Sequence, residues 1–509
     1  MMQASERQSA PVEGALTWLA TEPDDDPVAD LAALRGHFGR VRDPAVPGAE
    51  FASCLEQFDL RVLDICERFR ARLLDAPLPL PADLRLPTEG LIDALLDLAA
   101  GFQRVLEDVR SRWLGGQRSD AHALIVRAMR LSAEAYLFAC MIGAPAPAGF
   151  WLRTYALLAV AVRIEDEGGE DGGKAGPALA TAQAIMAVAA LQPESLTGRE
   201  LVWVRDYLDG AESETQIGQR RVGDANSLYW MDPEADAPPT ALSRRAAPEG
   251  EGLFYFNSGA LAADVARRLE WLELRIAQAE VVGLERDVDL LNADGPALPA
   301  GLTPVEALSL LRRMHERWSA PPHRVAPRRQ HEYTVQVCAG LRAIWEMFRR
   351  GEAQARIAEW MVCNESPGGY AIMSVSGVSG VLSAGMVLAL RPDAGKPWSL
   401  CIVRWIRSDN AEQVELGLQV VAHGGTAATI AFRGGDVKTI LPALILPPLS
   451  GVRHNPAVLV KTGSYASRRF VLVRDLEQRL YVAQGRVISL DMQTANIELL
   501  QYEIDPYPI

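Results

Sequence analysis

Two short segments in the C-terminal part of the chain contain the side chains best suited to bind an anionic ligand. The first segment contributes three arginines: Arg324, Arg328 and Arg329. The second contributes two small polar residues and a glycine: Asn364, Ser366 and Gly369. The planar guanidinium of arginine donates paired hydrogen bonds to phosphate oxygens or to the acceptor edge of guanine. Asparagine and serine supply short polar groups, and glycine permits a positive φ or a close approach of the ligand.

The second segment also has an ordinary structural explanation. Asn, Ser, Pro and Gly all favour turns, so the run 364–369 is typical of a connection between two strands. Its position between two β-rich stretches, downstream of an arginine cluster, favours a binding site. The sequence therefore predicts a site at a strand connection, with the turn as the structural alternative.

Two other segments resemble known functional motifs but lack residues that those motifs require. Residues 168–175 resemble a phosphate-binding loop, but Ala175 stands where a magnesium-binding hydroxyl is required, and two acids lie inside the loop. His331-Glu332 lacks the second histidine of a zinc protease motif. We therefore predict no catalytic residue, no metal site and no enzymatic activity.

Charge is distributed unevenly along the chain. Residues 321–509 contain 20 basic and 16 acidic residues, which leaves 31 basic and 49 acidic residues before them. An acidic N-terminal part would repel a nucleic-acid backbone, and the small positive excess of the C-terminal part suits a small anion. The charge pattern therefore does not predict a nucleic-acid polymer as partner, and we expect none.

The cysteines and the hydropathy predict a cytoplasmic protein. Six cysteines are scattered without a Cys-x-x-Cys pair, as expected for reduced thiols. The first residues lack the charged start and apolar run of a secretory signal. The longest apolar stretch, residues 155–162, is far shorter than the roughly 20 residues that cross a bilayer, so we expect no membrane span.

The periodicity of apolar residues divides the chain into an α part and a β part. Residues 1–49, rich in Pro, Ala and acids, are predicted to be mostly flexible, with one short helix near residues 28–38. Residues 50–320 repeat apolar positions at three- and four-residue steps, which predicts an irregular all-helical domain.

The pattern changes near residue 333 to short β-rich runs separated by Gly, Pro, Asn and Asp. Residues 321–430 predict a small antiparallel barrel preceded by an arginine-containing linker, with residues 340–357 as an interrupting excursion or short helix. Residues 431–509 predict a further β-rich module, either a second barrel or an extension of the first. The expected fold is a multidomain α-then-β chain.

The residues of the β part resemble the PilZ family. That family pairs an Arg-x3-Arg segment with a downstream Asp/Asn-x-Ser-x-x-Gly segment. Residues 324–328 match the first element and residues 364–369 match the second. The runs 382–391 and 403–421 are similar to later PilZ strands, so the resemblance covers about 110 residues.

The resemblance implies a receptor for cyclic-di-GMP, a ligand with two phosphates and two guanines, and no other cofactor. It implies ligand contacts from six residues: Arg324, Arg328, Arg329, Asn364, Ser366 and Gly369. One departure concerns the arginine register. If the family motif begins at Arg328, its second arginine position is occupied by Glu332, which would repel phosphate.

Three functional hypotheses follow. In the first, cyclic-di-GMP orders the arginine linker and changes a contact with an unidentified protein partner, made through the helical domain or the last β module. In the second, the chain is a ligand-independent PilZ-like scaffold at a motility or secretion apparatus, which Glu332 favours. In the third, the helical domain is an enzyme regulated by the barrel, which would need a polar cluster in a helical pocket.

Overall fold

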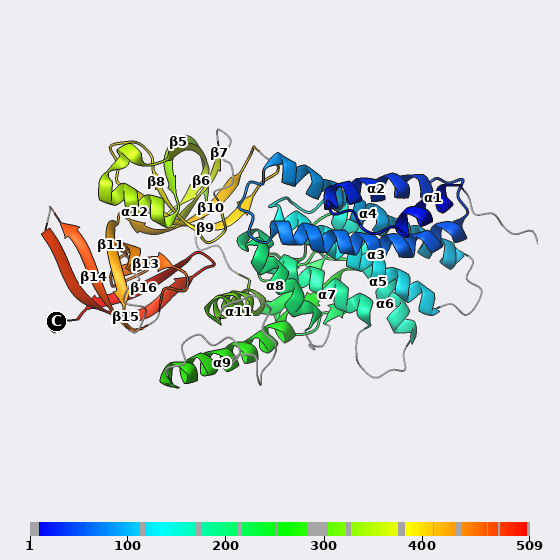
Figure 1. The fold of residues 1–509 in the computed structure, drawn as a ribbon. Coiled ribbons are helices and arrows are strands. Elements are labelled where there is room, and N and C mark those ends of the chain that lie inside the picture. Colours follow the sequence, from blue (N-terminus) through cyan, green and yellow to red (C-terminus); the bar gives the residue numbers. More distant parts are fainter. Residues whose placement is uncertain are drawn as a thin grey trace, which may run out of the picture.

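The structure is a computed structural model in which a helical part is followed by two β-barrels (Figure 1). It describes residues 10–111, 118–168, 176–210, 216–250, 252–282, 304–321, 327–374, 382–410, 412–433, 440–465, 467–476 and 479–505. The expected succession of an α part and a β-rich part is confirmed. The loop resembling a phosphate-binding motif lies almost entirely outside the described residues.

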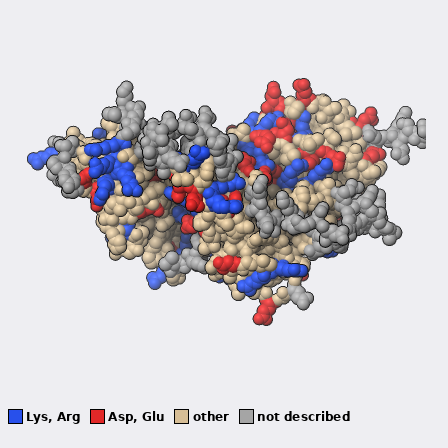
Figure 2. Space-filling view, turned by 90° about the horizontal axis from the view of Figure 1, so that it is seen from below, with Lys and Arg blue, Asp and Glu red and all other residues tan. Residues whose placement is uncertain are grey.

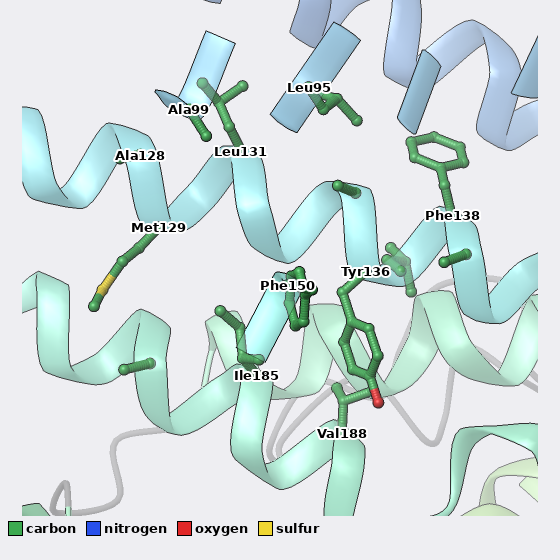
Figure 3. Close-up of a cluster of buried hydrophobic side chains, with 14 of the residues drawn as sticks. Leu95, Ala99, Ala128, Met129, Leu131, Tyr136, Phe138, Phe150, Ile185 and Val188 are labelled. Carbon is green, nitrogen blue, oxygen red and sulfur yellow. The ribbon is translucent and has the colours of Figure 1, made fainter. Parts of the chain in front are cut away.

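The helical part contains the elements α1 Ala10–Leu19, α2 Pro27–Val41, α3 Gly48–Leu73, α4 Ala82–Ser111, α5 Arg118–Met141, α6 Phe150–Gly168, α7 Pro177–Ala190, α8 Gly198–Asp209, α9 Gly259–Val282 and α11 Pro304–Ser319. Helix α5 contacts α4, α6, α7 and α8, and its Leu131 and Phe138 are buried among their side chains (Figure 3). A helix that is apolar on most sides belongs in the centre of a domain. Among the described residues, no helix is long and apolar enough to cross a membrane.

The segment before residue 50 differs from the flexible lead that its composition predicts. It forms α1 and α2, whose apolar faces join the helical core. The acids of this segment are used locally: Asp26 caps α2 by accepting from Val28 N. Asp30, 1% exposed, accepts from Arg61 and Arg68 of α3 at 2.8 and 2.5 Å. Two acids of this segment thus serve the fold: Asp26 caps a helix, and Asp30 forms a buried ion pair.

The helical part also contains a small sheet that the periodicity does not predict. Its strands, in the order β1-β4-β2-β3, are β1 Ile217–Gly218, β4 Phe254–Asn257, β2 Leu228–Met231 and β3 Thr240–Ala241. The strands are two to four residues long, too short for an alternating pattern to be visible in sequence. Tyr229, Phe254 and Phe256 join the helical core, so the sheet closes one side of it.

The first barrel is formed by β5 Arg329–Ala339, β6 Ile357–Ser366, β7 Gly369–Ser374, β8 Val387–Arg391, β9 Ser399–Arg407 and β10 Glu415–His423. All its strand pairs are antiparallel, and β8 pairs with β5 to close the barrel. Its core contains alternate residues of each strand, such as Val335, Val337 and Leu416. The interruption after β5 is the helix α12 Leu341–Arg350.

The second barrel is formed by β11 Thr426–Phe432, β12 Leu441–Leu446, β13 Ala457–Lys461, β14 Arg469–Leu476, β15 Arg479–Gln493 and β16 Ile497–Ile504. It is a closed barrel, which decides between the two alternatives left open for the last module. The boundary expected at residue 430 falls inside β11. When strands are counted along the chain, both barrels have the same order: first, second, third, sixth, fifth, fourth.

The two barrels share a hydrophobic core. Leu400 and Ile402 of β9 pack in one cluster with Leu444 of β12 and with Met347 of α12. Helix α12 therefore lies between the barrels, and Trp345 donates from Nε1 to the Ala428 carbonyl at 2.6 Å. A second link forms where Thr494 Oγ1 donates to the Gly385 carbonyl at 2.8 Å.

The helical part is joined to the first barrel by a buried arginine, Arg85 of α4, which is 2% exposed. Its guanidinium donates to the Ser408 carbonyl at 2.8 Å and to Ser408 Oγ at 3.0 Å, just after β9. The same group donates to the Ile142 carbonyl at 3.4 Å and to Glu89 at 2.8 Å. One side chain therefore satisfies polar atoms from both parts of the chain.

We expect Arg85→Met to destabilise the protein by at least about 2 kcal/mol, because it leaves buried acceptors on both sides without a donor. The control is Arg342→Met, at an 85% exposed arginine of α12 paired only within its helix; we expect it to change stability by less than about 0.5 kcal/mol. Urea unfolding measures both. Equal losses in the two variants would contradict a joining role for Arg85.

Candidate ligand-binding site

The candidate site is at the β6–β7 hairpin of the first barrel. Ile372 points into the barrel core, so alternation turns its neighbour Ala371 away from the core. Asn364 pairs with Ala371 across the hairpin and therefore lies on the outer face. Ser366, two residues further along β6, shares that face and pairs with Gly369. The register thus places Asn364, Ser366 and Gly369 on the outer face of the hairpin.

A hydrogen bond connects the arginine segment to this hairpin. Arg328, just before β5, donates from Nη1 to Asn364 Oδ1 at 3.0 Å. Arg329 begins β5 and pairs in register with Glu365. Arg324 lies outside the described residues. Two of the three predicted arginines are therefore placed beside the predicted hairpin.

Glu365, the acid inside the motif, is directed differently from its neighbours. It pairs with Tyr370, which packs against the barrel core. Its carboxylate accepts from the Tyr333 hydroxyl at 2.6 Å and lies 3.4 Å from His331 Nε2. Burial, and then the contact with Glu365, raises the pKa of Tyr333. Tyr333 therefore remains a hydrogen-bond donor to Glu365 and holds that carboxylate on the side opposite to Asn364.

A β-bulge displaces Glu332, the acid at the disputed arginine position. The β5–β6 register shifts between Gln330 and Tyr333, so His331 and Glu332 fall in the irregular stretch. Burial, followed by the carboxylates of Glu415 and Glu332, raises the pKa of the half-buried Cys363 thiol. Glu332 is therefore close enough to Cys363 to act on it electrostatically.

Gly369 is required by the neighbouring strand. A Cβ atom at this position would lie 2.0 Å from the Leu418 carbonyl oxygen of β10. The neighbouring Ser366 Oγ donates to the Gly369 carbonyl at 3.3 Å across the hairpin. The structure gives this glycine a role that the sequence does not predict: it lets the neighbouring strand of the barrel approach closely.

Sequence reasoning missed Tyr333 and Leu418. Strict alternation along the strand suggests that Glu365 faces away from Asn364 and Ser366. Its partner, the hydroxyl of Tyr333, could not be identified in this way because Tyr333 lies 32 positions earlier in the sequence. The contact between Gly369 and Leu418 depends on the pairing of β7 with β10, which no local pattern reveals. In the part of the chain that the structure describes, no group of three His, Cys, Asp or Glu side chains could hold a metal ion.

Comparisons with known proteins agree with this geometry. Residues 13–220 match the family described as the N-terminal domain of the cyclic-di-GMP receptor FimW, and residues 346–426 match the family described as its middle PilZ domain. The barrel that contains the hairpin belongs to the PilZ domain family. The match to the PilZ domain contains the hairpin of Asn364, Ser366 and Gly369, whereas Arg328 precedes it.

A curated relative is the cyclic-di-GMP receptor FimW of Pseudomonas aeruginosa, 28% identical over 101 residues. The aligned segment covers 19% of this chain and 16% of that protein. The match to the FimW N-terminal domain extends over α1 to α8, so the helical part and the PilZ barrel both have counterparts in one kind of protein.

We expect Gly369→Ala to destabilise the PilZ barrel by about 1–3 kcal/mol, because the added methyl group forces β10 away from β7. Gly368→Ala is a matched control, since a Cβ atom there meets nothing within 4 Å. Thermal unfolding of both variants measures the difference. A stable Gly369→Ala protein would show that the close approach is not required.

Proposed function

We propose that this PilZ protein is a cytoplasmic cyclic-di-GMP receptor, and not an enzyme, which converts ligand binding into a changed protein contact. The observation that carries the proposal is the hydrogen bond between Arg328 and Asn364, which joins the two elements of the family motif. The relative FimW is a cyclic-di-GMP receptor, which supports the same ligand.

The chemistry of the outer face suits this ligand. Arg328 supplies a guanidinium group for a phosphate or a guanine edge, and one paired guanine contact discriminates by about 1–3 kcal/mol, whereas Arg329 shares the side of its register partner Glu365. Asn364 and Ser366 add short polar groups beside Arg328. Glu365 is engaged by Tyr333, so its negative charge is directed away from the anion. Figure 2 views the molecule from below, the side on which the second barrel lies, and shows acidic and basic side chains mixed over the helical end.

The linker offers a route from the ligand to the helical part. Helix α11 ends with the buried Trp318, whose Nε1 donates to the Ala187 carbonyl at 3.0 Å. Pro321, also buried, follows closely, and only six residues separate it from Arg328. A ligand that draws Arg328 toward phosphate therefore acts on a short tether fixed to the helical part. The ligand shifts the equilibrium between two arrangements of the barrel against the helical part. The size of this shift is set by the difference between its affinities for the two arrangements. The output is a contact with a protein partner, through the helical part or the second barrel.

A ligand-independent scaffold is the second candidate function, and the position of Glu332 favours it. An acid near the arginine segment weakens the attraction for phosphate. In that case the PilZ barrel would act through protein contacts alone, at a motility or secretion apparatus.

Calorimetric titration with cyclic-di-GMP separates the two functions. For a receptor, we expect binding by the wild-type protein and about 10- to 100-fold weaker binding by Arg328→Ala, which loses the guanidinium contacts. Ser366→Ala should lose less, because it removes a single hydroxyl group.

Arg342→Ala is the control for this titration, because it removes one exposed positive charge from α12 without touching the hairpin. It should bind as the wild type does. Absence of heat at tens of micromolar ligand, together with normal function of an Arg324/Arg328/Arg329 triple-alanine variant, would reject the receptor and support the scaffold.

A further inference from the structure

Three arginines from two parts of the chain line one small cavity. Arg313 and Arg317 come from α11, and Arg404 comes from β9 of the PilZ barrel. Thr494 of the second barrel completes the lining, and the cavity measures about 30 Å³. In Figure 1, α11 lies on the side of the helical part that faces the barrels. The cavity is therefore at a junction of all three parts.

The three guanidinium groups differ in how they are paired. Arg313 forms an ion pair with Glu200, which is 5% exposed. Arg317 donates to the Gln192 side-chain oxygen, a neutral partner. For Arg404, the described residues supply no hydrogen bond and no ion pair within bonding distance, although the residue is only partly exposed. A partly buried guanidinium without an acceptor is costly, because it loses water without replacement.

The charges around this cavity do not balance. Glu316 attracts both Arg317 and Arg404, and Glu194 attracts Arg317 but is also paired with Arg407 at 3.5 Å. Arg244 adds a further positive charge. Burial, followed by the repulsion of Arg404, lowers the pKa of Arg317 to about 10. Around the cavity there are thus five arginines and only three glutamates, namely Arg244, Arg313, Arg317, Arg404 and Arg407 against Glu194, Glu200 and Glu316. Of these glutamates, Glu316 is exposed to water.

The position of Arg404 relates this cavity to the hairpin site. Arg404 stands at a register shift of β9 opposite Gly417 and Leu418 of β10. Leu418 is the residue whose carbonyl lies against Gly369. Two strand spacings, about 10 Å, therefore separate Arg404 from the motif glycine. The hairpin and the cavity are close enough for one extended ligand to reach both.

We propose that Arg317 and Arg404 bind a phosphate group in this cavity, and that the bound phosphate holds α11 against the PilZ barrel. Arginine forks fit phosphate oxygens, and both guanidinium groups line the cavity. The phosphate is either free inorganic phosphate or one phosphate of a cyclic dinucleotide whose remainder occupies the hairpin site. Only the second source rests on the proposed function.

The test compares the full-length wild type with Arg404→Gln, and Arg342→Gln serves as the control because it removes an exposed charge elsewhere. Thermal unfolding is measured in inorganic phosphate and in chloride at equal ionic strength. If free phosphate is the ligand, phosphate should raise the Tm of the wild type and of Arg342→Gln by about 1–3 °C, and that of Arg404→Gln by nothing.

The second arm titrates cyclic-di-GMP into the same three proteins. If the phosphate belongs to the dinucleotide, Arg404→Gln should bind about 10-fold more weakly than the control, although its hairpin is intact. In chloride without ligand, Arg404→Gln should be as stable as the wild type or more so, because it removes an unpaired positive charge.

The two measurements together show whether the phosphate site exists and which ligand occupies it. A phosphate-specific Tm rise that Arg404→Gln lacks, or a weaker dinucleotide affinity in that variant, supports the site and identifies the source. Equal responses of Arg404→Gln and Arg342→Gln in both arms would overturn it. Wild-type protein that binds no cyclic-di-GMP but is stabilised by phosphate would keep the anion site and reject only the receptor function.

Discussion

The fixed contact between Arg85 and the end of β9 is the interaction on which the remaining geometry depends. A guanidinium that is 2% exposed must find acceptors, and it finds them in Ser408 of the PilZ barrel and in Ile142 of the helical part. The contact is reinforced by backbone pairing of Leu78 with Leu382 and by the bond from Ser408 N to the Gly143 carbonyl. These bonds set where β9 meets the helices, and hence where α11 and its linker lie relative to the hairpin.

Within the PilZ barrel, strand alternation separates the charges of the motif. Asn364 and Ser366 face outward beside Arg328, whereas Glu365 turns to Tyr333. A run that contains an acid between two candidate ligand-binding positions is therefore compatible with an anionic ligand. The close packing of Gly369 on Leu418 fixes the hairpin against β10.

Much of the architecture could be predicted because it rests on local patterns. Helical periodicity and the change to short β runs identified both parts of the chain, and the motif located the hairpin of Asn364 and Ser366. The failures have physical causes. Asp26 and Asp30 look like solvated acids until their cap and arginine partners are known. The strand β11 joins the second barrel because of its pairing with β12 and β14, which sequence does not specify. Arg404 was overlooked because its meaning comes from α11, far away in sequence.

The shared strand order of the two barrels has a consequence for how this chain could have arisen and how it can be divided. Consecutive barrels with one order are the arrangement that duplication of an ancestral barrel produces. The two barrels are nevertheless joined, because Leu400 and Ile402 of the first pack with Leu444 and Leu459 of the second. A fragment ending at residue 425 would expose this apolar surface to water, which favours aggregation. Because they share this hydrophobic cluster, the two barrels cannot be separated without exposing apolar side chains.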